Sequence, residues 1–181
     1  DDGRYVIPTE AWVTTAPEPL KTQAAKLENS PVWWEEEWPV LSVSWEDLMS
    51  YGAWKREKLG VLVSLPHEIA REKAARGTDG RGYPWGSEFD PTFCNNMQSH
   101  AQGMRPTAVD SFPADESPGG VRGLGGNSRD LVLNDPGEKF PGWRMSRGGV
   151  WSSSGPLLRA AYSSGFSSSL VRYFYGGRLV W

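Results

Sequence analysis

The chain has 181 residues, 38% of them hydrophobic, and its 19 lysines and arginines against 22 aspartates and glutamates give a net charge of −3. This length and composition favour one folded domain with a sizeable core, and the charge balance excludes a general basic surface, so no nucleic-acid partner is expected. The sequence has no continuous apolar run of about 18 residues, so we expect no membrane span.

The high glycine and proline content predicts a loop-rich fold. The 21 glycines and 14 prolines indicate many turns, and ten tryptophans indicate that indole rings fill much of the core. Cys94 is the single cysteine, which excludes an intramolecular disulfide and any site that needs two thiolates. The opening Asp1-Asp2-Gly3 has neither a basic start nor an apolar stretch, so a signal peptide is expected to be absent or removed, and localisation cannot be assigned.

A first helix is predicted from Trp45 to about Leu59. Ser44 and Asp47 have the spacing of a capping box, in which each side chain accepts from the backbone N–H of the other. Apolar residues then follow at helical spacing, and Gly60 is placed to end the helix.

A second helix is predicted to open at Pro66-His67-Glu68 and to end near Arg76, with Gly77 as its left-handed cap. Beyond Thr78 the pattern changes to turn chemistry, first in residues 79–86. The remaining hundred or so residues are therefore predicted to be short strands and loops.

The C-terminal stretch, residues 147–181, has an unusual composition. From Phe140 onward there is no Asp, Glu, Lys, Asn or Gln, while Ser, Gly, Tyr, Phe and Leu are frequent. A flexible Ser/Gly linker lacks bulky apolar residues, whereas Tyr and Phe set among Ser and Gly are typical of antibody-type binding surfaces. The composition therefore predicts a folded scaffold that carries a binding surface.

Ordered landmarks along the chain resemble a known family. They lie at residues 40–47, 65–68, 74–77, 79–81, 83–86, 125–127, 147–151 and 158–161. Their order and spacing resemble formylglycine-generating-enzyme (sulfatase-modifying factor) domains. The resemblance implies an α+β fold of the C-type-lectin-like type, in the formylglycine-generating-enzyme subclass, with two helices, small twisted antiparallel sheets and many loops. It covers residues 39–181 as one domain, with residues 1–38 as a more weakly matching N-terminal part.

A metal-dependent oxidase of that family is one alternative. The family's chemistry resembles a copper–thiolate mechanism, which needs a cysteine pair after the Arg-Gly-Gly landmark, where this chain reads Ser152-Ser153-Ser154. Related iron-dependent enzymes need a cluster of histidines, and this chain has His67, at a predicted helix start, and His100. We therefore expect no catalytic residues, no cofactor and no enzyme activity. A degenerate structural module is the other alternative.

The resemblance also raises the question of structural calcium. The family signature Gly-Asn-Val-Trp-Glu-Trp appears here as residues 126–131, Gly-Asn-Ser-Arg-Asp-Leu. Family members often hold Ca²⁺ near this point, and Asn127 and Asp130 keep oxygen ligands of the kind that Ca²⁺ accepts. These two residues are the candidate calcium ligands.

A narrower resemblance concerns residues 147–181. Variable proteins of diversity-generating retroelements begin this segment with Arg-Gly-Gly-Ser-Trp, pass through Leu-Arg-Ser/Ala-Ala-Tyr-Arg and close on Gly-Phe-Arg-Leu-Val. The corresponding residues here are 147–151, 159–163 and 176–180. In that system template adenines are replaced at random, so Asn codons become codons that never encode Trp, Lys, Gln, Glu or Met. From Trp151 onward Lys, Gln, Glu and Met are absent, and Trp occurs at the landmark Trp151 and at Trp181.

The resemblance sorts the segment into a scaffold and a variable surface. The expected scaffold landmarks are Arg147, Gly148, Gly149, Trp151, Arg159, Ala160, Gly176 and Arg178. The expected ligand-binding surface comprises Ser152, Ser153, Leu157, Ser164, Gly165, Phe166, Ser167, Leu170, Arg172, Tyr173, Phe174 and Tyr175, although Leu170, Phe174 and Tyr175 could instead belong to the core. We expect a non-enzymatic, receptor-like protein that binds a protein or other macromolecule through this surface, whose identity one randomised sequence does not encode.

Overall fold

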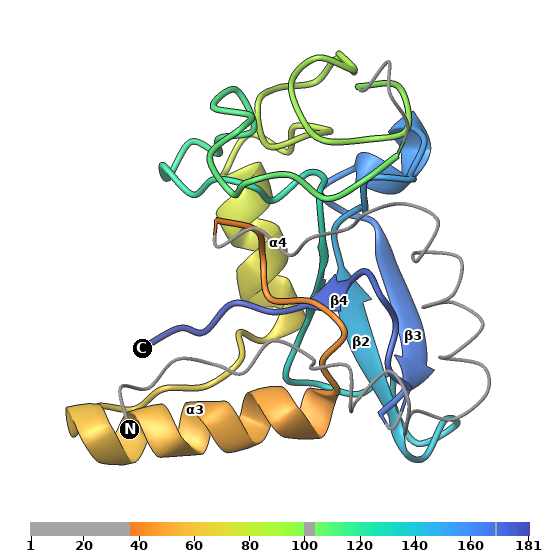
Figure 1. Cartoon of the computed structure of the whole chain (residues 1–181). Helices are drawn as coiled ribbons and strands as arrows, with labels where there is room; N and C mark the ends of the chain where they lie inside the picture. The colour runs from red at the N-terminus through yellow and green to blue at the C-terminus, as the bar shows by residue number, and fades with distance from the viewer. Residues whose placement is uncertain (1–36, 100–103, 169) are drawn as a thin grey trace. The chain divides into compact units, whose positions relative to one another are not determined.

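The computed structural model describes residues 37–99, 104–168 and 170–181, and Glu37–Trp181 forms one compact unit. The predictions made for residues 1–36 and for His100 lie outside the described residues. The elements in chain order are α3 (Trp45–Leu59), α4 (Glu68–Arg76), β1 (Arg129–Leu131), β2 (Trp143–Arg147), the 3₁₀ helix η1 (Gly155–Leu158), β3 (Ser163–Ser167) and β4 (Tyr175–Gly176) (Figure 1).

Helix α3 has the predicted bounds and the predicted cap. The Asp47 N–H donates to Ser44 Oγ over 3.0 Å, and the Ser44 N–H donates to Asp47 Oδ2 over 2.9 Å, so the capping box is complete. Gly60 ends the helix in the left-handed conformation with φ 68°. Leu48 is the buried residue of this helix in the main core, and Trp45 and Met49 pack against the same core.

Helix α4 is also confirmed, with one difference at its end. His67 is the N-cap, and its ring Nδ1 accepts from the Ile69 N–H over 3.3 Å, as expected for capping. Gly77 has a positive φ of 64°, but its ψ of −140° lies outside the left-handed helical region. The chain leaves the helix against Pro118, whose Cγ lies 3.0 Å from where a Gly77 Cβ would stand, so a glycine is needed for this close approach as well as for φ.

The four-stranded sheet has the order β3-β2-β1-β4 and is mixed. Strand β2 pairs antiparallel with both β1 and β3, whereas β4 pairs parallel with β1 (Figure 1). The α+β lectin-like class is confirmed, and the small sheet is antiparallel as expected except at β4, which pairs parallel. Strand β3 at one edge already runs in the direction of β1, and β4 at the opposite edge runs the same way, as expected for strands joined by a crossover connection.

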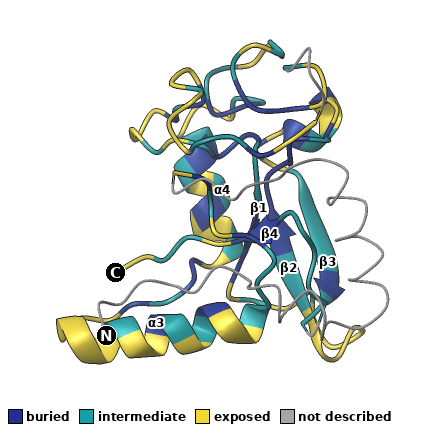
Figure 2. Cartoon of the chain, viewed as in Figure 1, coloured by how far each residue is buried: buried dark blue, intermediate teal, exposed yellow. Residues whose placement is uncertain are grey.

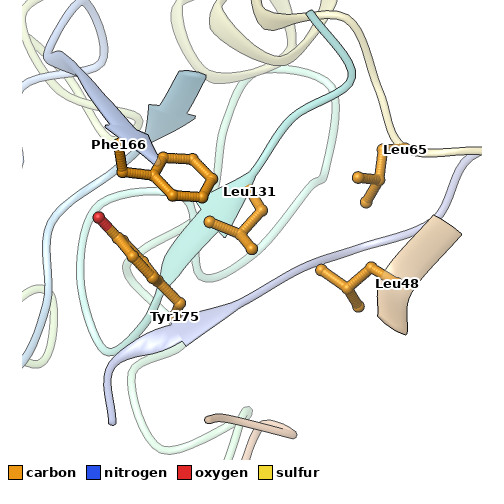
Figure 3. Close-up of a cluster of buried hydrophobic side chains, with 5 residues drawn as sticks. All are labelled: Leu48, Leu65, Leu131, Phe166 and Tyr175. Carbon is orange, nitrogen blue, oxygen red and sulfur yellow. The ribbon is translucent and has the colours of Figure 1, made fainter. Parts of the chain in front are cut away.

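The main core lies between the sheet and α3. It is built from Leu48, Leu65, Leu131, Phe166 and Tyr175, contributed by a helix, a loop and three strands (Figure 3). The Phe166 and Tyr175 rings pack with their centroids 4.8 Å apart. Figure 2 shows buried residues along β1 and β4, and mostly intermediate ones along β3, which is an edge strand. Within the described parts of the chain, no helix is long and apolar enough to cross a membrane.

Candidate ligand-binding surface

Arg147 fixes the start of the C-terminal segment to helix α4. Its guanidinium forms ion pairs with Glu68 Oε2 at 2.9 Å and with Glu72 Oε2 at 2.7 Å, and it donates to the Ala161 carbonyl over 3.1 Å. Its side chain is 7% exposed, so the pairs are shielded from water. Gly148 beside it has φ 87°, and a Cβ there would stand 2.7 Å from Arg71 Nη2. The first landmark of the segment is therefore structural.

Arg178 fixes the end of the segment in a similar way. Its Nε donates to Asp130 Oδ2 over 3.0 Å, and its Nη2 donates to the Gly123 carbonyl over 2.9 Å. Asp130 Oδ2 also accepts from Arg71 Nη2 over 2.9 Å, and Arg71 in turn donates to the Leu124 carbonyl over 2.8 Å. This buried ionic network joins α4, β1, the loop before β1 and the final landmark.

The same network bears on the candidate calcium ligands. Asp130 Oδ2 already receives two guanidinium groups, from Arg71 and Arg178. Asn127 Oδ1 accepts from the Thr107 N–H over 3.0 Å and from the Asn95 side-chain amide over 2.9 Å. A calcium ion at Asp130 Oδ2 or Asn127 Oδ1 would therefore have to displace these donors, and calcium binding at this pair stays a prediction.

Cys94 supplies one buried thiol, whereas the family's copper chemistry needs a cysteine pair. The thiol is fully buried in a cluster with Tyr83 and Leu158, so the fold brings it beside the segment where the family carries its cysteine pair. Burial, with a smaller contribution from the charge of Asp115, raises the pKa of Cys94 to about 12. The thiol of the metal-free protein is therefore protonated at neutral pH. Among the described residues, no three His, Cys, Asp or Glu side chains are grouped to hold a metal ion.

Three residues assigned to the variable surface are buried, and their surface assignment is wrong. Ser153 is 2% exposed, and its Oγ accepts from the Val150 N–H over 3.0 Å, which holds the turn before η1. Phe166 and Tyr175 are 2% and 5% exposed because β3 and β4 turn these rings inward onto Leu131. A sequence rich in Ser and Gly still needs some large apolar side chains in its core, and these two supply them.

The other assigned surface residues keep partial exposure. They are Ser152, Leu157, Ser164, Gly165, Ser167, Leu170, Arg172, Tyr173 and Phe174. Leu170 and Phe174 pack against the main core with one side. Of the scaffold landmarks, Arg147, Gly148, Gly149, Trp151, Ala160 and Gly176 are buried and Arg178 is half-buried, whereas Arg159 is exposed.

A cluster that sequence reasoning missed lies among these residues. The guanidinium carbon of Arg129 lies 5.0 Å from the centroid of the Tyr162 ring and 5.8 Å from that of Phe174. Tyr173 packs edge-on against Phe174 at 5.1 Å and against Trp151 at 5.7 Å. We call these five residues the arginine–aromatic cluster. The one sequence signal is that Arg129 stands where the family signature has Trp. Its ring partners, Tyr162 and Phe174, lie too far along the chain for the sequence to indicate the contact.

The helices, mixed sheet and buried landmarks define an α+β domain of the C-type-lectin-like, formylglycine-generating-enzyme class. Residues 4–181 match the family described as Sulfatase-modifying factor enzyme 1-like domain, and the chain belongs to that family. The match begins well before residue 39, where the sequence landmarks begin.

Individual relatives agree with this classification. The chain is 32% identical over 126 residues to inactive C-alpha-formylglycine-generating enzyme 2 of Bos taurus, an alignment that spans 64% of this chain and 39% of that protein. The fold is similar to PvdO from Pseudomonas aeruginosa, with a TM-score of 0.72 at 19% identity over 87% of this chain and 74% of that one. It is also similar to Treponema denticola variable protein 1, with a TM-score of 0.71 at 16% identity over 83% and 74% of the two chains. At these identities the two structures establish the fold.

Proposed function

We propose that this chain is a non-enzymatic ligand-binding domain whose C-terminal segment, residues 147–181, presents a surface diversified by adenine-directed retroelement mutagenesis. The observation that carries the proposal is that the segment has fixed ends and a partly exposed middle. Its two ends are held by ion pairs of Arg147, which is buried, and of Arg178, which is half-buried, and most of the expected variable side chains between them are partly exposed. Such an arrangement lets the intervening side chains change while the backbone path is kept.

Two further observations support a binding role over catalysis. The segment has serines where the family's thiol pair belongs, and the pKa of Cys94 is raised by burial, which keeps its thiol protonated. Bovine and mouse relatives carry the name of an inactive formylglycine-generating enzyme, and one fold neighbour is named as a variable protein. A large, partly exposed set of Tyr, Phe, Ser and Gly side chains suits recognition of a macromolecule.

The test is genetic. We would sequence the encoding locus in several isolates and search beside it for a reverse transcriptase gene and a near-copy of codons 147 to 181. The proposal predicts that the copy exists, that it differs from the coding segment opposite its adenines, and that the differing codons fall on partly exposed positions such as Ser152, Arg172 and Tyr173. A segment that is invariant between isolates, with no such copy, would contradict the proposal.

A further inference from the structure

Arg129 is a buried cation without an acidic partner among the described residues. Its side chain lies under the rings of Tyr162 and Phe174, and the residue is 9% exposed. Its Nε donates to the Gly148 carbonyl over 2.9 Å. The other strongly buried guanidiniums differ, since Arg71 and Arg147 each pair with a carboxylate. Burying an unpaired charge is unfavourable, and two ring faces compensate for it in part.

The outer nitrogens of Arg129 remain open to a ligand. Neither Nη atom of Arg129 donates to a described residue. Among the described residues, the fully buried side-chain atoms without a hydrogen-bond partner are Arg71 Nη1, Arg144 Nε and Arg147 Nε, and the Nη atoms of Arg129 are not among them. Both Nη groups therefore retain contact with solvent at the edge of the arginine–aromatic cluster. A guanidinium presents its Nη groups as a planar fork that matches the two oxygens of a carboxylate.

Arg172 is a second basic residue of the assigned surface. Burial raises the pKa of Tyr175, and the charges of Arg129 and Arg172 both oppose that rise, so both arginines act on the same phenol. Arg172 is half-buried and forms no ion pair with a described residue. The sequence from residue 140 to residue 181 contains no Asp or Glu that could neutralise this region. No acidic side chain of this segment therefore neutralises the two arginines.

We propose that Arg129 is the fixed anion-binding centre of the variable surface and that it binds the carboxylate of an acidic side chain in the ligand. Arg172 adds charge in this sequence, and the rings of Tyr162 and Phe174 cover the apolar part of the bound side chain. This inference rests on the proposed function and extends it. Arg129 lies outside residues 147–181, so versions of the protein with other C-terminal segments would keep the same preference for an acidic group.

The direct test uses a small probe on the intact protein. We would follow the Nε–H signals of the arginines by ¹H–¹⁵N NMR, assign Arg129 with the variant Arg129→Lys, and titrate N-acetyl-glutamate N-methylamide at constant ionic strength. The matched neutral probe is N-acetyl-glutamine N-methylamide. We expect a saturable shift of the Arg129 signal with the glutamate probe and none with the glutamine probe. Equal shifts with both probes, no shift with either, or tighter binding of inorganic phosphate than of the glutamate probe would overturn the proposal.

A second test separates this inference from the proposed function. A random peptide library would be selected on the wild type, on Arg129→Gln and on Arg172→Gln, with Arg159→Gln as the control because that side chain is exposed and outside the cluster. Selected peptides should be rich in Asp and Glu, bind Arg129→Gln about tenfold more weakly or worse, and bind the control unchanged. Peptides that bind wild type and Arg129→Gln equally would overturn the inference and leave the binding function intact. Failure to select any peptide would count against the proposed function, and the probe titration would still decide the role of Arg129.

Discussion

Cys94 and Asp115 are neighbouring buried groups, and burial raises the pKa of both. For the thiol the rise, to about 12, is reinforced by the charge of Asp115. For the carboxyl the rise, to about 6, is opposed by the N–H groups of Gly125 and Gly126, which donate to it, and by the charges of Arg71 and Arg178. Each group gives a measurable prediction.

Cys94 should be almost inert toward alkylation in the folded protein. A rise in the thiol pKa from 9.0 to about 12 lowers the thiolate fraction near pH 8 about a thousandfold, and the closed cluster around Cys94 slows access further. Mass spectrometry after a timed exposure to iodoacetamide measures the rate. The control is the same protein in denaturant, which should be labelled within the pulse. Equal rates in the two samples would show that the thiol is accessible and ionised.

Asp115 should make the protein less stable as the pH rises from about 4 to about 6. Its folded-state pKa of about 6 lies above the ordinary value of 3.8, so in this window the folded state binds more protons than the unfolded state. The stability that this gives at low pH is lost as the carboxyl ionises, and the full change is about 3 kcal/mol.

The variant Asp115→Asn isolates that contribution. It cannot ionise, so the difference between its unfolding free energy and that of the wild type should shift by that amount across the window, whatever the absolute cost of the substitution. Urea unfolding at several pH values from 4 to 7 measures the difference. A difference that stays constant with pH would mean that the carboxyl is ionised throughout.

At the scale of single elements, helix α3 depends on its N-terminal cap. Ser44→Ala removes the Oγ that accepts from the Asp47 N–H and should lower the free energy of unfolding by about 1 kcal/mol. The loss should appear in global unfolding because Leu48 couples α3 to the main core. The matched control is Ser50→Ala, an exposed position within the helix, where alanine should be neutral or slightly stabilising. Equal losses at both positions would show that the cap is unimportant.

The helices could be predicted because their signals are local. The Ser44–Asp47 box, Gly60 and the His67 cap each act within a few residues, and they set the ends of α3 and α4 as observed. The parallel pairing of β4 could not be predicted, because it depends on which strand the chain meets after crossing the sheet. A strand of two residues carries almost no pattern of its own.

The candidate site was predictable in composition but not in detail. The absence of acidic residues after Phe140 and the sequence landmarks pointed to residues 147–181 as the candidate segment. The direction in which each side chain faces depends on strand register, and a Ser-rich strand such as β3 offers little alternation from which to infer it, so Phe166 was misassigned. Arg129 was missed because its contacts with Tyr162 and Phe174 join distant parts of the chain.

At the scale of the whole molecule, two adjacent serines test the division between scaffold and surface. Ser152 is partly exposed, whereas Ser153 is buried and accepts the Val150 N–H. Ser152→Tyr should change the free energy of unfolding by no more than about 0.5 kcal/mol, and Ser153→Tyr should lower it by about 3 kcal/mol through overpacking and loss of the acceptor. Thermal or urea unfolding of both variants gives the answer, and similar values for the two would contradict the assignment.

Replacing Tyr173 should weaken ligand binding much more than it destabilises the fold. Tyr173 lies between Trp151 and Phe174, is partly exposed and is not one of the core residues. Tyr173→Ser should weaken binding of a selected peptide ligand about tenfold or more while the melting temperature falls by a few degrees at most. Phe166→Ala, in the core, should instead cost about 3 to 5 kcal/mol of stability. A Tyr173→Ser protein that melts as early as Phe166→Ala would place Tyr173 in the scaffold.

Because Arg178 lies close to the end of the chain, its contacts form only when the chain has been translated up to that residue. Arg178 is held by Asp130 and by the carbonyls of Arg122 and Gly123, and Val180 beyond it bonds back to Ser64. A polypeptide that stopped anywhere between residues 147 and 177 would lack these contacts, and one that stopped before Tyr175 would also leave β1 open where β4 pairs with it. Proteases remove such open chains readily. Truncated proteins that arise from frameshifts or premature stop codons would therefore be degraded. The molecules that persist would be those translated through Arg178.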